Sequence, residues 1–138
     1  MSDPQPCIFC AIIDGRAPAH VVRSDERTIA FLDINPATSG HTLVVPRAHA
    51  RTLLDLDPAD ATSMMAAAQS VALVLDRALR PEGLTLFQAN EPAGWQTVFH
   101  VHLHVLPRWA GDGLVPPWTV TPGDPHELAA LGERILRG

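Results

Sequence analysis

The chain has 138 residues, of which 46% are hydrophobic and 18% are charged, and its formal net charge is −5. This length suits a single domain over residues 1–138 whose core needs no disulfide, and the composition is that of a globular protein. The negative net charge argues against a nucleic-acid polymer as a partner, because proteins that bind nucleic acids usually carry a basic patch. All the basic residues are arginine, which excludes Schiff-base chemistry on a lysine.

The chain carries no recognisable targeting or membrane segment. Residues 1–6 are short and polar and lack the features of a secretory signal. The longest apolar stretch, residues 64–75, is interrupted by Gln69 and Ser70 and is too short to span a bilayer. We therefore expect a cytoplasmic protein with no membrane partner.

The first part of the chain predicts a short helix followed by three strands. Residues 7–14 can form one or two helical turns, which Gly15 would end. Apolar runs separated by turn-forming residues predict strands, over 20–22, 28–32 and 42–45. The third of these strands is rich in β-branched residues, which predicts burial on both faces.

A long helix is the clearest element. Asp57 can cap it, Pro58 suits its first position, and Pro81 follows its expected end near Leu79. One stripe of apolar side chains predicts that the helix packs on a core, namely Met64, Ala68, Val71, Leu75 and Leu79.

The last part of the chain predicts two strands and a helix, in order over residues 84–87, 99–106 and 127–136. Asp124 and Pro125 can begin the helix. The order β-β-β-α-β-β-α indicates an α+β fold, with an antiparallel sheet of about five strands beside the helices. Two long loops, residues 90–97 and 107–122, are expected to carry function.

Three histidines alternate with apolar residues in the second of these strands. Because successive side chains of a strand point to opposite faces, His100, His102 and His104 would share one face at intervals of about 6.5–7 Å. Core packing would not select such a row, since every buried imidazole needs a partner. Three chemistries could use it: metal ligation by all three rings, proton relay, or attack on phosphorus by a neutral imidazole.

Residues 100–106 resemble the signature of the histidine triad family, in which three histidines alternate with apolar residues. Other segments match that family in order along nearly the whole chain, namely Cys7-Ile8-Phe9-Cys10, residues 33–36, residues 40–46, His49, residues 96–98 and Pro107-Arg108. The Cys-x-x-Cys and the short length resemble its bacterial, zinc-containing members. The resemblance implies the family fold, with one long helix and short terminal helices, and a homodimer that joins two sheets with the long helix at the interface.

The resemblance also implies a reaction. His102 would attack an α-phosphorus and form a nucleotidyl-histidine that water resolves, while the carbonyl of His100 holds its other ring nitrogen. His104 would contact the phosphate and manage protons. The substrate would be a nucleoside phosphoramidate or a dinucleoside polyphosphate, and the product a nucleoside monophosphate. The alternative is a nucleotide-binding regulatory protein whose turnover is incidental.

Further residues receive roles from the same resemblance. Gln96 and Thr97 would donate hydrogen bonds to the phosphate or the leaving group, and Asp33 would hold the ribose hydroxyls. An upstream amide contact could come from Asn90, which we favour, or from Gln88. Apolar positions around the base match Phe9, Ile12, Leu32 and Ile34, for which plain core packing is the other interpretation.

The spacing of Cys7 and Cys10 suits one metal ion, a redox pair or two buried thiols. A redox pair is expected to follow a strand, and only six residues precede Cys7. The resemblance adds His49 and His100, which would complete a structural Cys₂His₂ zinc site. Without zinc, His49 could instead belong to the active site. The remaining histidines, His20, His41 and His126, are expected to be ordinary surface or structural residues.

Two segments depart from the family pattern. Relatives usually place glycine directly before the glutamine, where this chain has Trp95, so either a residue is inserted or glycine is replaced. Residues 107–112 resemble the dinucleoside polyphosphate hydrolase branch, whereas the length and the cysteine pair resemble the phosphoramidate-cleaving branch. The branch therefore stays open.

Overall fold

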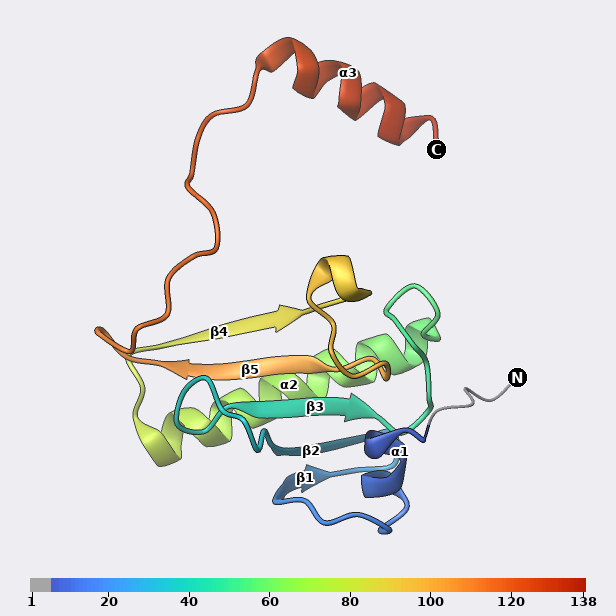
Figure 1. The fold of residues 1–138 in the computed structure, drawn as a ribbon, viewed down its shortest axis with the longest axis vertical. Helices are drawn as coiled ribbons and strands as arrows, with labels where there is room; N and C mark the ends of the chain where they lie inside the picture. Colours follow the sequence, from blue (N-terminus) through green and yellow to red (C-terminus); the bar gives the residue numbers. More distant parts are fainter. Residues whose placement is uncertain (1–5) are drawn as a thin grey trace.

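The computed structural model describes residues 6–138 and shows the expected α+β architecture (Figure 1). The elements in chain order are α1 (Ile8–Ile13), β1 (Val21–Ser24), β2 (Thr28–Leu32), β3 (Thr42–Pro46), α2 (Pro58–Leu79), β4 (Gly83–Gln88), a 3-10 turn (Pro92–Gly94), β5 (Leu103–Arg108) and α3 (Pro125–Leu136). Every helix and strand that the sequence predicts is present, with boundaries that differ by a few residues.

The five strands form one antiparallel sheet in the order β1-β2-β3-β5-β4. The long helix α2 packs on β2, β3 and β5 across one face, while α1 lies at the end of β3 on the side turned to the viewer in Figure 1. The two outer strands, β1 and β4, are open edges.

The central strand β3 is buried along its whole length, as predicted. Val44 belongs to the core beneath α2. Leu43 and Val45 point to the opposite face and pack with Phe9 of α1 and Phe31 of β2 in a second core. Because both faces of β3 are covered, its neighbour β5 is held between two packed layers, and β5 carries the last of the three histidines.

The limits of α2 follow the signals in the sequence. The side chain of Asp57 accepts a hydrogen bond from the backbone N–H of Ala59 at 2.8 Å, and Pro58 occupies the first turn. The helix ends with Arg80 in the left-handed conformation, at φ 51°. Four of the five predicted stripe residues are buried, and Leu79 is the exception at 38% exposure.

The predicted strand over residues 99–106 is wrong at both ends, because β5 begins at Leu103 and continues to Arg108. The backbone N–H of Val101 donates to the carbonyl of Ala50 in a loop at 2.8 Å, outside the sheet. The ring of His100 is completely buried and donates from Nε2 to the carbonyl of Pro46 at 2.8 Å. Burying the first histidine therefore bends the chain before the strand begins.

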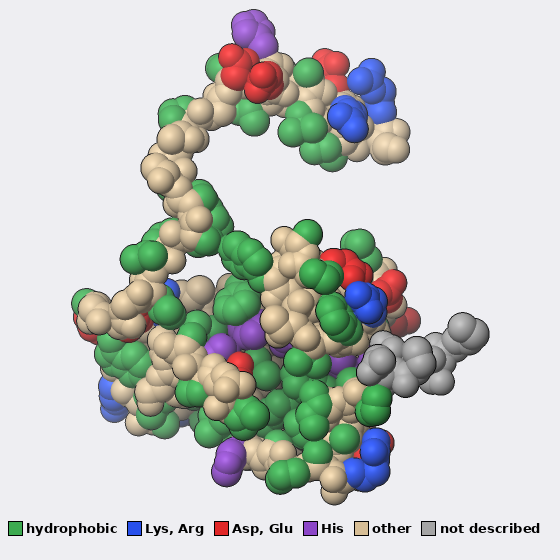
Figure 2. Space-filling view, viewed as in Figure 1, with side chains coloured by type: hydrophobic (Ala, Val, Ile, Leu, Met, Phe, Trp, Pro, Cys, Tyr) green, Lys and Arg blue, Asp and Glu red, His purple; other side chains and the backbone are tan. Residues whose placement is uncertain are grey.

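The C-terminal segment stands apart from the rest of the molecule (Figures 1 and 2). After Leu114 the chain runs outward, and no residue of α3 is buried. We call residues 115–138 the C-terminal arm. In the described range, 6–138, no helix has the length and apolar character needed to cross a membrane.

Candidate functional site

A cavity of about 600 Å³ lies between α1, the ends of β2 and β3, and the histidine segment. Figure 2 shows histidine atoms in a hollow of the visible face, surrounded by apolar side chains. Most of the residues that the sequence assigns to catalysis or substrate binding line this cavity, namely Phe9, Ile12, Leu32, Asp33, Ile34, Thr97, His102 and His104. Gln96 and Asn90 do not line it.

His102 lies against the cavity with its two ring nitrogens in different environments. Nδ1 donates a hydrogen bond to the backbone carbonyl of His100 at 2.7 Å, as the sequence predicts. This bond fixes the proton on Nδ1, so Nε2 keeps its lone pair. Within residues 6–138 no hydrogen bond reaches Nε2. Burial lowers the pKa of His102 below its ordinary value, which favours the neutral ring.

A fourth histidine controls the tautomer of His104. The backbone N–H of Ala37 donates to Nδ1 of His41 at 3.0 Å, so the proton of that ring sits on Nε2. Nε2 of His41 then donates to Nδ1 of His104 at 2.9 Å. His104 must therefore carry its own proton on Nε2. The result is a lone pair on Nε2 of His102 beside a donor on Nε2 of His104.

His41 corrects the expectation of an ordinary histidine, because it is 5% exposed and belongs to the site. Its place in residues 40–46, a segment that matches the family pattern, is the sequence signal that could have singled it out. Burial lowers the pKa of His41. Burial and the neighbouring His102 and His41 lower the pKa of His104 to about 3. All three rings are therefore neutral near pH 7.

Aromatic contacts hold the histidine rings in place. Phe87 of β4 stacks on His104 with ring centroids 3.9 Å apart. Phe9 meets His102 edge to face at 5.0 Å. The ring centroids of His102 and His104 are 4.8 Å apart, which is closer than the spacing predicted from an ideal strand. His102 precedes β5, so the two residues do not share a regular strand.

Asp33 follows β2 and presents a carboxylate at the rim of the cavity. Oδ1 accepts the backbone N–H of Asn35 at 2.8 Å, which fixes the turn. Oδ2 lies 3.5 Å from Nε2 of His41. The carboxylate of Asp33 therefore keeps acceptor capacity toward a ligand in the cavity. Together with His41 and His104 it also forms a cluster with metal-ligand spacing, although its two imidazoles already share a hydrogen bond.

The side-chain amide of Gln96 is hydrogen-bonded within the loop before the triad, and Gln96 does not line the cavity. Its Nε2 donates to the carbonyls of Arg51 at 2.6 Å and Val98 at 3.0 Å, and its Oε1 accepts the backbone N–H of Glu91 at 2.7 Å. These three bonds use the amide to shape the loop before the triad. Thr97, the next residue, remains at the cavity.

Trp95 has an unusual backbone conformation for a residue with a bulky side chain. Its φ is 76°, in the left-handed region that glycine adopts without strain, and its side chain is 66% exposed. A bulky residue therefore occupies a backbone conformation that favours glycine.

The side chain of Asn90 is hydrogen-bonded to two other segments of the chain. Its Oδ1 accepts the backbone N–H of Leu53 at 2.7 Å, and its amide is hydrogen-bonded to the side chain of Gln88. Asn90 and Gln88, the two candidates for the upstream amide contact, are therefore hydrogen-bonded to each other. They connect the end of β4 to the loop that precedes α2.

A second cluster lies beside the cavity and consists of the four predicted metal ligands, Cys7, Cys10, His49 and His100, whose donor atoms all lie within 4.8 Å of one another. Nδ1 of His100 is 3.1 Å from Nδ1 of His49 and 3.4 Å from Sγ of Cys7. Sγ of Cys10 is 3.4 Å from Nδ1 of His49 and 3.6 Å from Nδ1 of His100.

These separations fit the edges of a zinc-centred tetrahedron. With zinc–sulfur bonds of about 2.3 Å and zinc–nitrogen bonds of about 2.0–2.1 Å, the edges are roughly 3.3 Å between nitrogens and roughly 3.5 Å between nitrogen and sulfur. Nε2 of His100 carries the proton that it donates to Pro46, so Nδ1 is free to bind a cation. Burial and the neighbouring Cys7 raise the pKa of Cys10 to about 11, an effect that a bound cation would reverse.

The two clusters share one residue. His100 contributes its ring to the cysteine cluster and its carbonyl to Nδ1 of His102. Whatever fixes the ring of His100 also fixes the orientation of His102. None of the four cluster residues lines the cavity, so the cysteine cluster acts on it through His100.

Comparison with known proteins agrees with this geometry. The model of the HIT domain family matches residues 14–111. An uncharacterized HIT-like protein of Mycobacterium tuberculosis is 47% identical over 134 residues, which cover 96% of this chain and 91% of that protein. The adenosine 5'-monophosphoramidase of Schizosaccharomyces pombe is 35% identical over 130 residues, covering 94% of this chain and 95% of that protein.

A solved structure gives a further comparison. The crystal structure of a zinc-bound histidine triad family protein from Mycobacterium smegmatis superposes with a TM-score of 0.75 at 38% identity, over 96% of this chain and 97% of that one. The family match spans most of the chain, including β1 to β5 and the three histidines. The chain therefore belongs to the HIT domain family.

Proposed function

We propose that this protein is a nucleotide hydrolase or transferase that cleaves an activated α-phosphorus bond through a nucleotidyl-histidine intermediate on His102. The observation that carries the proposal is the pair of bonds that set the tautomers of His102 and His104. They place a lone pair and an N–H donor side by side at one cavity. The similarity to a protein named adenosine 5'-monophosphoramidase supports it.

In the first step Nε2 of His102 forms a bond to the α-phosphorus while the bond from phosphorus to the leaving amine or phosphate breaks. The leaving group departs with the bonding electrons and takes up a proton. The imidazole becomes a cation whose Nδ1–H stays on the carbonyl of His100. Nε2–H of His104 donates to a phosphate oxygen, where negative charge grows.

In the second step water attacks the phosphorus and the bond to Nε2 of His102 breaks. The nucleoside monophosphate leaves with the oxygen of that water, whose proton passes to solvent and balances the proton that the leaving group took up in the first step. The ring returns to its neutral form with the proton still on Nδ1. Thr97 supplies a hydroxyl donor at the rim of the cavity. For Gln96 and Asn90 we propose a supporting role, because their side chains hold the two neighbouring loops.

The substrate side of the cavity suits a nucleoside. Its walls are apolar, with Phe9, Ile12, Leu32 and Ile34 available to contact a base, and the carboxylate of Asp33 can accept the ribose hydroxyls. A cavity of about 600 Å³ is in the range of small-molecule sites. We propose adenosine 5'-phosphoramidate as the first substrate to test.

We further propose that the cysteine cluster binds one structural zinc ion through Cys7, Cys10, His49 and His100. The four donors would fill a tetrahedral site and leave no open position for a reacting water. Bound zinc would supply rigidity to His100 and so to His102. The zinc-bound relative supports this assignment. We also retain as proposals a single domain, a homodimer and a cytoplasmic location.

The decisive experiment compares the wild type with His102→Ala on adenosine 5'-phosphoramidate and on a diadenosine polyphosphate, following AMP release. We expect release to disappear in the variant while the fold and the zinc content are unchanged, and the preferred substrate assigns the branch. Equal rates of AMP release in both proteins would show that His102 is not the nucleophile. Tight AMP binding by a wild type with negligible turnover would favour the regulatory alternative.

A further inference from the structure

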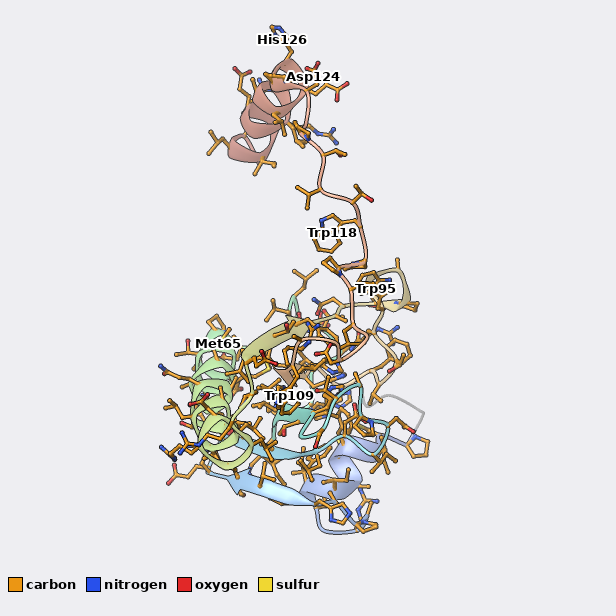
Figure 3. All side chains as sticks on the ribbon, turned by 90° about the vertical axis from the view of Figure 1, so that its left-hand side faces the viewer. Met65, Trp95, Trp109, Trp118, Asp124 and His126 are labelled. Carbon is orange, nitrogen blue, oxygen red and sulfur yellow. The ribbon has the colours of Figure 1, made fainter. Side chains whose placement is uncertain are left out.

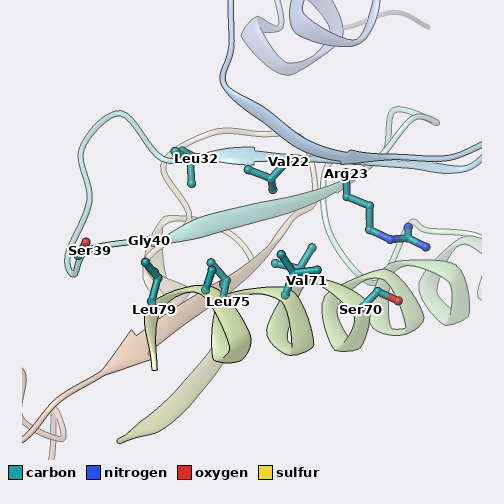
Figure 4. Close-up of a pocket in the computed structure, with 11 residues that line it drawn as sticks. Val22, Arg23, Leu32, Ser39, Gly40, Ser70, Val71, Leu75 and Leu79 are labelled. Carbon is teal, nitrogen blue, oxygen red and sulfur yellow. The ribbon is translucent and has the colours of Figure 1, made fainter. Parts of the chain in front are cut away.

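The described residues form other pockets besides the cavity of His102. One, of about 470 Å³, lies between α2 and the β1–β2 edge, and its lining is mainly aliphatic, with neither cysteine nor histidine (Figure 4). Another, of about 420 Å³, lies beside α1 and has Cys7, His49 and Arg51 in its wall. Two members of the cysteine cluster therefore face a pocket that is separate from the cavity of His102.

The cysteine cluster is accessible from this pocket. Cys7 and Cys10 are half-buried, His49 is exposed, and His100 is fully buried. A cysteine that binds a cation is held as the thiolate, which is also the form that reacts with oxidants. Cys7 belongs to the wall of the pocket and Cys10 does not. A small oxidant that enters the pocket therefore meets the sulfur of Cys7 first.

The two cysteines are placed to form a disulfide with each other. Their sulfur atoms lie within 4.8 Å of one another, and the backbone N–H of Cys10 donates to Sγ of Cys7 at 3.3 Å. Cys7 caps α1 and Cys10 lies one turn further on, which places their Cα atoms about 5 Å apart. Disulfides join Cα atoms that are about 4.4–6.8 Å apart. The chain has 2 cysteines, so no other disulfide can form within it.

The residues between the two cysteines belong to the reaction site. Ile8 and Phe9 both line the cavity of His102. The ring of Phe9 meets His102 edge to face at 5.0 Å and His100 at 5.9 Å, measured between centroids. A change in the first turn of α1 therefore acts on the surroundings of His102. A disulfide would also take two of the four donors away from the ion that holds the ring of His100, because its sulfurs carry no thiolate charge.

We infer that Cys7 and Cys10 form a redox switch for the reaction at His102. A peroxide converts the two thiolates into a disulfide, the cluster releases its metal ion, and turnover falls. A dithiol and fresh zinc restore the first state. The inference rests on the proposed zinc site and the proposed reaction, and it adds control of that reaction by an oxidant.

The oxidation proceeds in two steps. The thiolate of Cys7 attacks one oxygen of hydrogen peroxide, the oxygen–oxygen bond breaks, and hydroxide leaves and takes a proton from solvent, so that Cys7 becomes a sulfenic acid. The thiolate of Cys10 then attacks Sγ of Cys7, the sulfur–oxygen bond breaks, and a second hydroxide leaves and takes a proton. The two sulfurs together lose two electrons, the peroxide gains them, and two molecules of water form. Thiol–disulfide exchange with a dithiol returns both thiolates.

The experiment adds hydrogen peroxide stepwise to the full-length wild type loaded with zinc. Free zinc is measured with a chromogenic chelator, free thiols with a thiol reagent, and the intact mass by mass spectrometry. We expect one zinc ion released and two thiols lost per chain, a denatured mass lower by two hydrogens, and the disulfide on the tryptic peptide that ends at Arg16. Dithiothreitol with added zinc should reverse every change.

AMP release from adenosine 5'-phosphoramidate is followed on the same samples. We expect kcat of the oxidised protein to fall at least about tenfold, because a small displacement of a reacting group costs that much or more. A disulfide with released zinc and unchanged kcat would overturn the control of the reaction. No turnover by the reduced wild type would instead overturn the proposed reaction, and the zinc and thiol measurements would still report on the cysteine pair.

Cys10→His is the matched control, because histidine can bind a metal ion but cannot form a disulfide with Cys7. Peroxide should carry Cys7 of this variant to the sulfinic acid, which dithiothreitol does not reduce. Met65 is 55% exposed on α2, away from α1 (Figure 3), so its sulfoxide would add one oxygen to the mass of either protein. Dithiothreitol leaves that oxygen in place, which separates it from the disulfide.

Three results with the wild type would overturn the inference. The first is zinc retained with both thiols free in excess peroxide. The second is oxidation of Cys7 to the sulfinic acid without a disulfide, which would be damage and not a switch. The third is a wild type that binds no zinc when it is fully reduced.

Discussion

The hydrogen bond from His41 to His104 can be removed almost without changing volume, by His41→Leu. Loss of the donor frees His104 to move its proton from Nε2 to Nδ1. Nε2 would then present a lone pair instead of a donor to the phosphate. Leaving a buried polar atom without its partner costs about 1–3 kcal/mol. Since about 1.4 kcal/mol corresponds to tenfold in rate, kcat should fall by about 5- to 150-fold.

The assay is steady-state hydrolysis of adenosine 5'-phosphoramidate, with kcat and KM determined separately. His41→Gln is the matched control, because its amide nitrogen can occupy the place of Nε2 and donate to His104. We expect kcat of the Gln variant within about fivefold of the wild type, a smaller loss than one tautomer reversal costs. KM should change little in either variant. A Leu variant that retains wild-type kcat, with an unchanged thermal unfolding midpoint, would refute the tautomer argument.

Three further predictions follow from other parts of the site. Activity should decline as pH falls, with a midpoint below 6.5, because burial lowers the pKa of His102 and only the neutral ring can attack; a midpoint above 6.5 would contradict this. Cys7→Ser should lose bound zinc in elemental analysis and lower both thermal stability and kcat, since the cluster holds His100. Full activity in a zinc-free protein would show that the cysteine cluster does not contribute to catalysis at His102. Trp95→Gly should be about 1 kcal/mol more stable in urea unfolding than Trp95→Ala, because only glycine relieves the positive φ; equal stability would mean that this loop carries no strain.

The fold was largely predictable because its signals are local. Asp57, Pro58 and Pro81 mark the limits of α2, and the β-branched run of β3 indicates burial on both faces. The start of β5 was not predictable from alternation. The chain bends there because His100 turns its ring inward to Pro46 and the cysteine cluster, and these contacts come from segments more than 50 residues away.

The candidate site was also predictable only in part, because some of its contacts join distant segments. The four-residue cluster and the bond from His102 to the carbonyl of His100 were expected from the sequence and are present. The role of His41 was not predicted, because it depends on hydrogen bonds of its two ring nitrogens to Ala37 and His104 that form only in the folded chain. The resemblance implies a substrate contact for Gln96, and the structure shows its amide bonded to loop carbonyls, which the sequence did not predict.

The position of the C-terminal arm could not be read from the sequence either. Asp124 and Pro125 predict where α3 begins, and the structure confirms that start. The pattern of Leu128, Leu131 and Ile135 predicts an apolar face without saying which surface covers it. The outward course of residues 115–124 is visible only in the structure (Figure 1).

The most direct test of the central claim is to look for the covalent intermediate. The enzyme is mixed with adenosine 5'-phosphoramidate, quenched in base within the first turnovers to preserve a phosphorus–nitrogen bond, digested and analysed by mass spectrometry. The account predicts a nucleotidyl group on the peptide that ends at Arg108, localised to His102 and absent from His102→Ala. Rapid turnover by the wild type with no adduct on that peptide, or with the adduct on another residue, would contradict the assignment of His102 as the nucleophile.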